Sequence, residues 1–168
     1  MNMRLIFVAM SSVLLLGSSN ALRADGPGFS EKTIKGEWTT EFQGRTNSSG
    51  GLAMAGVPPG TPFFMVGRIE FDGDGHCQCF KKIVFDGYYV PEDDSYWMSE
   101  SCEYAVAPDG TAQLLISFPD IPTFLGMLPS SADQLEAVVN SRDRIDYIVS
   151  NLTIGILGKG SFKRQTLD

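Results

Sequence analysis

Apolar and polar residues alternate along many short segments of this chain. In residues 62–71, for example, Phe63 and Ile69 share one parity while Arg68 and Glu70 share the other. A period of two is typical of a β-strand with one buried face, and clusters of Gly, Pro, Asp and Asn between the segments mark turns. Residues 134–140 fit a helical turn equally well. Eight strands are predicted, over roughly residues 36–43, 62–71, 77–85, 95–106, 111–118, 134–140, 144–153 and 160–165.

The connections between these strands alternate between long and short. Residues 44–61, 86–94 and 119–133 are long connections, whereas residues 72–76 form a tight turn. Successive connections of an up-and-down antiparallel sheet lie at opposite ends, so the long loops should gather at one end. Eight such strands close naturally into a barrel with a packed interior or room for one small ligand. The predicted fold is therefore all-β, a single eight-stranded antiparallel up-and-down barrel over residues 36–168.

The first residues differ from the rest of the chain. Arg4 precedes the apolar run LIFVAMSSVLLLG, and the small residues Ser19 and Ala21 follow it, which is the pattern of a secretory signal peptide. We expect residues 1–21 to be this peptide, with cleavage as late as residue 24, and residues 22–35 to be a flexible N-terminal segment. The mature protein would then be secreted or periplasmic. The apolar run is too short to span a bilayer and no later segment replaces it, so no stable membrane insertion is expected.

Charge narrows the class of partner. The formal net charge is −7, and an acidic chain repels phosphate backbones, so no nucleic-acid partner is expected. The glycine-rich stretch GLAMAGVPPG has neither the lysine nor the following helix of a phosphate-binding loop, and no cofactor is predicted. A homo-oligomer is compatible with this sequence.

The segment FDGDGHCQCF, residues 71–80, contains the only histidine and two of the three cysteines. As a calcium loop it fails after two ligand positions, and its C-x-C spacing differs from that of zinc knuckles, so no metal is predicted. Three cysteines in an exported chain permit one disulfide. The hairpin register favours Cys79–Cys102, with Cys77–Cys102 as the alternative. His76 lies at the end with the tight turns and no nucleophile elbow is present, so no catalytic residue is predicted.

One carboxylate in segment 95–106 is ambiguous. Strict alternation places Met98, Glu100 and Cys102 on the inward face, where a carboxylate has a raised pKa or a charged partner. One extra residue in the strand, a β-bulge, would instead turn Glu100 outward. The sequence leaves both alternatives open.

Three short motifs resemble those of a known barrel family. GEW at Gly36–Trp38 resembles the G-x-W motif of the lipocalins, RDRIDY at 142–147 resembles their second motif, and Arg164 stands near the C-terminus. The chain is thus similar in plan to a lipocalin or wider calycin barrel, without the C-terminal helix. The resemblance implies that Gly36, Trp38 and Arg164 are structural and that Arg164 packs over Trp38 at the end with the tight turns. The stretches VGRIEFDGDGH, CEYAVAPDGTAQL and GKGSFKRQ more closely resemble small exported bacterial proteins of unassigned function, a resemblance that implies no activity.

Apolar residues gather in the long loops, where they would form a lid across the mouth of the barrel. Exposed apolar loops mark contact with a ligand or partner, and the alternative is that they pack on one another and close the barrel. We predict that the protein binds a small, largely apolar molecule at this mouth. The predicted ligand-binding residues are Met54, Val57, Phe63, Phe64, Met65, Met98, Glu100, Phe124 and Met127. Two other classes stay open: an isomerase or cyclase in the same pocket, as in allene-oxide-cyclase-like barrels, and a structural or interaction protein with a filled interior.

Overall fold

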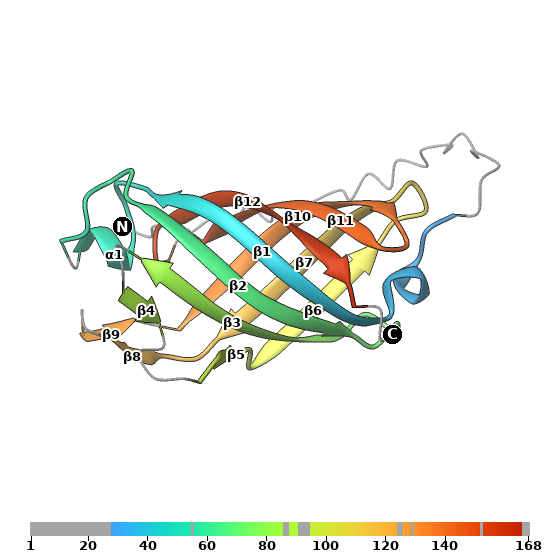
Figure 1. The fold of residues 1–168 in the computed structure, drawn as a ribbon, viewed down its shortest axis with the longest axis horizontal. Helices are drawn as coiled ribbons and strands as arrows, with labels where there is room; N and C mark the ends of the chain where they lie inside the picture. Colours follow the sequence, from blue (N-terminus) through green and yellow to red (C-terminus); the bar gives the residue numbers. More distant parts are fainter. Residues whose placement is uncertain are drawn as a thin grey trace, which may run out of the picture.

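The computed structural model describes residues 28–54, 56–85, 88–90, 95–123, 126–128, 130–151 and 153–165 (Figure 1). Strands dominate, and the two helical segments are a single turn each. In chain order the elements are η1 (Glu31–Ile34), β1 (Gly36–Thr46), α1 (Gly51–Met54), β2 (Pro62–Phe71), β3 (Cys77–Phe85), β4 (Tyr88–Val90), β5 (Trp97–Met98), β6 (Ser101–Val106), β7 (Thr111–Phe118), β8 (Ile121–Thr123), β9 (Gly126–Leu128), β10 (Ser131–Ser141), β11 (Arg144–Asn151) and β12 (Ile156–Arg164).

Nine strands form one antiparallel path in the order β4–β3–β2–β1–β12–β11–β10–β7–β6, and β5 pairs with β3 outside this path. The sheet curls into a half-barrel (Figure 1). The predicted all-β, antiparallel, up-and-down architecture is confirmed, and residues 134–140 belong to a strand rather than a helical turn. The prediction that eight strands form a closed barrel is not confirmed, because the strand path has nine members and two free ends. The long connections contribute the short strands β4, β8 and β9, and the path ends at β4 and β6.

Strands β3 and β6 meet along a seam that is bridged at separate points. Phe80 on β3 pairs with Met98 on β5, and His76 forms an isolated antiparallel bridge with Glu103. The disulfide Cys77–Cys102 crosses the same seam. We use the word seam for this junction between β3 and β5–β6 from here on.

The segment between β5 and β6 decides whether Glu100 points inward or outward, which the sequence left open. Trp97 and Ser99 are buried, and the next inward residue is Cys102, while Met98 and Glu100 are exposed. One extra residue therefore shifts the alternation between Ser99 and Cys102, as a β-bulge does. The inward position predicted for Met98 is wrong, and the outward alternative for Glu100 is confirmed.

The favoured disulfide Cys79–Cys102 is also wrong, because the bond joins Cys77 to Cys102 and leaves Cys79 free and buried. The register across the seam is the physical reason. Phe80 pairs with Met98, and the one extra residue after Ser99 then places His76 opposite Glu103. The next residue of β3, Cys77, therefore lies opposite Cys102 with a Cα–Cα distance of 4.9 Å.

The end with tight turns has the geometry that the lipocalin resemblance implies. The Trp38 ring is buried, and the Arg164 guanidinium lies over it with the Cζ atom 4.7 Å from the ring centre. Arg164 also donates hydrogen bonds to the carbonyl oxygens of Lys35 and Thr33, and the Trp38 indole donates to the carbonyl of Ile34. Ile34 is itself buried, so the last part of the segment expected to be flexible, residues 22–35, packs against the sheet.

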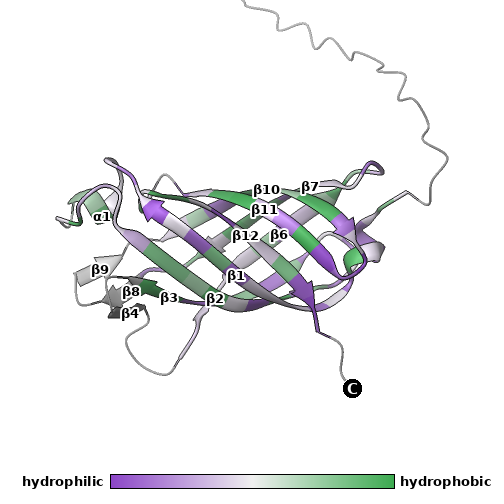
Figure 2. Cartoon of the chain, turned by 45° about the horizontal axis from the view of Figure 1, so that its top comes forward, coloured by the Kyte–Doolittle hydropathy of each residue, from purple (hydrophilic) through white to green (hydrophobic). Residues whose placement is uncertain are grey.

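The long and the short connections lie at opposite ends of the sheet, as their alternation in the sequence predicts. The elements within long connections, namely α1, β4, β8 and β9, gather at the left of Figure 1, and the tight turns lie at the right. Hydrophobic and hydrophilic residues follow one another along the strands (Figure 2), consistent with the period of two. Within the described residues, no helix combines the length and the apolar character needed to cross a membrane.

Candidate ligand-binding site

The described residues at the long-loop end pack into the core. Leu52, Val57 and Phe63 are buried, and the backbone NH of Leu52 donates to the carbonyl of Ile154, which fixes α1 on the turn between β11 and β12. Val57 and Phe63, predicted as ligand-binding residues, thus belong to the buried core. Met54 is 90% exposed.

The remaining predicted ligand-binding residues do not form one cluster. Met98 and Glu100 are exposed on the outer side of the seam. Phe124 lies outside the described residues, as does the side chain of Met127 in β9. Phe64 and Met65 line a groove on the outer face of the sheet, described below.

Sequence reasoning missed a buried ion pair on the inner side of the curled sheet. The Lys81 ammonium on β3 lies 2.6 Å from Asp133 Oδ2 on β10, and both side chains are almost fully buried. Asn151 on β11 donates to the other carboxylate oxygen at 2.6 Å. The Lys81 Nζ atom also lies 3.6 Å from the ring centre of Phe118 and 4.7 Å from the ring of Trp97. Charges this deep need such partners, and the inward parity of residues 79, 81 and 83 was the signal that could have located Lys81.

The other ionisable groups of the interior are held neutral. Burial raises the pKa of the Cys79 thiol to about 12, against the smaller opposing effect of Lys81. Burial also raises the pKa of Tyr147, whose hydroxyl shares a hydrogen bond of 2.5 Å with Thr40 Oγ1. Neither side chain is ionised near neutral pH, so neither can act there as an anionic nucleophile or base.

The segment FDGDGHCQCF begins with an exposed turn closed by one carboxylate. Asp72 Oδ1 accepts hydrogen bonds from the backbone NH groups of Asp74 and His76, and the bond from Asp74 is the main reason that the pKa of Asp72 is lowered. His76 Nδ1 lies 3.5 Å from Asp72 Oδ2. In the described part of the chain, no three His, Cys, Asp or Glu side chains come together as a metal-binding group. Asp72 stabilises this turn through its two hydrogen bonds to backbone NH groups.

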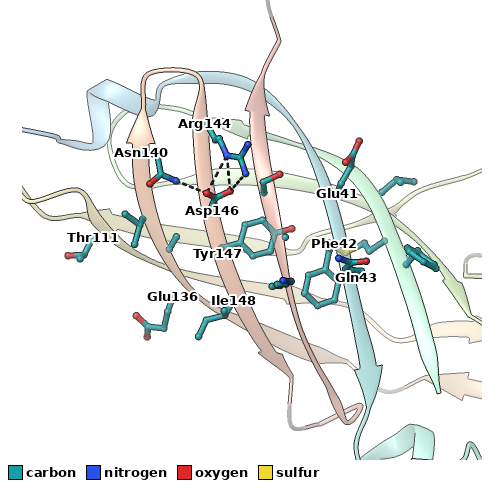
Figure 3. Close-up of a pocket in the computed structure, with 18 residues that line it drawn as sticks. Glu41, Phe42, Gln43, Thr111, Glu136, Asn140, Arg144, Asp146, Tyr147 and Ile148 are labelled. Atoms are coloured by element: carbon teal, nitrogen blue, oxygen red, sulfur yellow. Dashed lines mark hydrogen bonds and ion pairs between the residues drawn. The ribbon is translucent and has the colours of Figure 1, made fainter. Parts of the chain in front are cut away.

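A groove of about 1110 Å³ crosses the outer face of the sheet (Figure 3). It runs from β2 over β1, β12 and β11 to β10, where outward-facing side chains form two neighbouring cross-strand rows. The strand register places these rows as Phe64–Gln43–Lys159–Ile148–Glu136 and Val66–Glu41–Ser161–Asp146–Val138. We call this feature the outer groove.

The two sides of the outer groove are apolar. Phe64 and Val66 on β2 are 57% and 48% exposed, and Ile148 on β11 and Val138 on β10 are 58% and 49% exposed. Exposed apolar side chains grouped around a depression, rather than scattered singly, are typical of a contact surface. These residues therefore give the groove a surface on which an apolar face can pack.

Polar side chains occupy the rest of the groove. Asp146 accepts hydrogen bonds from Arg144 Nε at 3.0 Å and from Asn140 Nδ2 at 2.7 Å (Figure 3). Gln43, Lys159 and Ser161 lie between the two apolar sides, and their side chains make no hydrogen bond or ion pair with any other described residue. The groove thus combines one fixed polar group with side chains that are free to bind a ligand.

Two glycines, Gly158 and Gly160, allow β12 to form the floor of the groove. A Cβ atom on Gly160 would lie 2.6 Å from the Tyr147 ring, and one on Gly158 would lie 2.6 Å from the Phe42 ring. These two aromatic rings stack nearly parallel beneath the strand, with ring centres 6.2 Å apart. The absence of side chains lets β12 lie directly on the rings, which support the groove from inside.

Comparison of this chain with protein-family models, with curated proteins and with solved structures gives no match. The resemblance to the lipocalins thus rests on Gly36, Trp38, Arg164 and the segment 142–147.

Proposed function

We propose that this protein binds an amphipathic molecule, and that the ligand lies in the outer groove. The observation that carries the proposal is the groove itself, about 1110 Å³ in volume with exposed apolar side chains on both sides. Ligand sites are usually concave and combine apolar surface with polar groups that orient the ligand. The proposal keeps the predicted class of function, a binding protein, and moves the site away from the mouth because Val57 and Phe63 are buried.

We further propose that the sheet acts as a closed barrel of eight strands, with β5 and β6 counted as one bent strand that meets β3 at the seam. The bridge between His76 and Glu103 and the Cys77–Cys102 disulfide support this closure. The disulfide also supports export, since disulfides persist in oxidising compartments. The interior holds the buried core residues and the Lys81–Asp133 ion pair, so we place the ligand on the outer face, unlike lipocalins, which enclose their ligand.

The groove is tested by substituting its two most exposed apolar residues and following a solvatochromic dye such as ANS. Phe64→Ala combined with Ile148→Ala removes both apolar sides, and we expect the dye signal to fall severalfold. Leu115→Ala is the matched control, because Leu115 is 44% exposed on β7 and does not line the groove.

Changes in the backbone NMR chemical shifts when the dye is added show where the dye binds. Shifts that cluster on β1, β2, β11 and β12 support the outer groove. Shifts confined to α1 and the neighbouring loops, or a dye signal that falls equally in Leu115→Ala, contradict it and return the site to the mouth of the barrel.

A further inference from the structure

We propose that the ligand of the outer groove is a neutral saccharide chain. The proposal rests on the binding function stated above and assigns its ligand class. The shape of the groove, the polar side chains that line it and its charge each support the proposal.

The shape of the groove suits an extended molecule. It crosses five neighbouring strands, from β2 to β10, and four gaps of about 4.8 Å between strands give a length of roughly 19 Å. The groove lies on the outer face of the sheet and is lined by exposed side chains, so a chain can lie across the strands and continue beyond both ends. A compact molecule would fill only part of this length.

The polar side chains that line the groove favour a hydroxyl-rich ligand over an alkyl chain. Nine of the thirteen outward-facing residues that line the groove are polar, and an alkyl chain would cover them without offering hydrogen bonds, which is unfavourable. Gln43 and Ser161 can each donate and accept, Lys159 donates, and the carboxylates of Glu41 and Glu136 accept. Sugar hydroxyls donate and accept as well, so a saccharide can pair with every one of these groups.

The apolar sides fit the same ligand. A pyranose ring has hydroxyl groups at its rim and C–H groups on its faces, and such a face packs on an aromatic ring or a branched aliphatic side chain. Phe64 on one side and Ile148 on the other offer such surfaces, with the unpartnered polar groups of Gln43 and Lys159 between them. The alternation of apolar and polar groups along the groove thus matches the alternation around a sugar ring.

Charge disfavours an anionic chain as the ligand. The groove holds the carboxylates of Glu41, Glu136 and Asp146 and the cations Arg144 and Lys159, and Arg144 lies 3.0 Å from Asp146 in an ion pair. Glu41 lies 3.9 Å from Lys163 in a second ion pair, which leaves Glu136 and Lys159 as opposite charges. The groove thus has no excess of positive charge, and the chain as a whole carries a net charge of −7, which disfavours polyanions. The ion pair and the bond from Asn140 hold Asp146 in place before binding, and preorganised groups lose less freedom when a ligand binds.

The test uses the chain with its disulfide intact and two sets of probes. The first set consists of neutral gluco-, xylo- and chito-oligosaccharides of increasing length, and the second of alkyl alcohols and a lysine-rich peptide. Isothermal titration calorimetry should show binding of at least one neutral saccharide series, with affinity that rises with chain length until the groove is filled. Gln43→Ala should weaken this binding about fivefold, the effect of one lost neutral hydrogen bond, and Phe64→Ala should weaken it at least as much.

Matched controls separate a lost contact from a damaged fold. Gln78→Ala, on the exposed face of β3 outside the groove, and Leu115→Ala on β7 should leave the affinity unchanged. Saccharide binding that is insensitive to Gln43→Ala and Phe64→Ala, or absent for every neutral series, overturns the proposal. If alkyl alcohols or the peptide bind in a Phe64-dependent way while no saccharide does, the saccharide class is wrong and the binding function stands. If nothing binds the groove, both proposals fail.

Discussion

The disulfide across the seam should contribute a large part of the stability of this protein. Cys77 and Cys102 are separated by 25 residues. In the chain-entropy description, closing a loop of this length in the unfolded state is worth about 3.5 kcal/mol at 25 °C. Since small domains are stable by roughly 5–15 kcal/mol in total, loss of this bond should bring the protein close to unfolding.

The perturbation is the double variant Cys77→Ala/Cys102→Ala, which leaves no second thiol to pair with Cys79. Urea unfolding followed by circular dichroism measures the effect. With a urea dependence of about 1.5 kcal/mol per molar, the midpoint should fall by roughly 2 M. Reductant should lower the midpoint of the unmodified protein by a similar amount and leave that of the double variant unchanged.

Cys79→Ala is the control. It removes a buried sulfur and should cost roughly 1 kcal/mol, but its midpoint should still respond to reductant because its disulfide is intact. If Cys79→Ala abolishes the response to reductant and Cys77→Ala preserves it, the bond joins Cys79 to Cys102, and the register shift inferred between Ser99 and Cys102 is refuted.

Three further predictions concern the interior. Lys81→Met should destabilise the protein by about 3–5 kcal/mol in urea unfolding because it leaves Asp133 buried without its cation, and Lys81→Met/Asp133→Leu should recover part of this loss; equal losses in both would contradict the pairing. The Cys79 thiol should resist alkylation until global unfolding, and its contribution to stability, complete below the ordinary pKa of 9.0, should be lost as the pH rises toward about 12; rapid alkylation of the folded protein would show that the thiol is accessible. Gly160→Ala should cost about 1–3 kcal/mol because its Cβ atom collides with the backbone carbonyl of Glu41 and with the Tyr147 ring. A Gly160→Ala/Tyr147→Leu variant relieves only the second collision and should lose somewhat less than the sum of the two changes.

Local patterns predicted the strands well, because a period of two needs only neighbouring residues. The predicted segment 62–71 coincides with β2 and 111–118 with β7. The errors arise where one residue changes the parity. A bulge between Ser99 and Cys102 places Met98 on the opposite face from Cys102. Together with the pairing of Phe80 with Met98, it brings Cys77 opposite Cys102.

The candidate site was harder to predict because it depends on distant strands. Phe64 and Ile148 are 84 positions apart in sequence and face the same groove only because β12 pairs with both β1 and β11. Lys81 and Asp133 likewise come from strands that are not neighbours in the sheet. Alternation places each residue inside or outside, but the matching of particular residues requires the register of the whole sheet.

The pairing of β1 with β12 has a consequence for how the molecule is made. The Thr39 hydroxyl donates to the carbonyl of Lys163, a partner 124 positions away, so the first strand of the sheet is completed by the last. During synthesis β1 has an unpaired edge until nearly the whole chain exists, and such edges invite pairing with other chains. Contacts this distant also slow folding. Chaperone supply and the rate of chain production should therefore affect the yield of this protein more strongly than its final stability suggests.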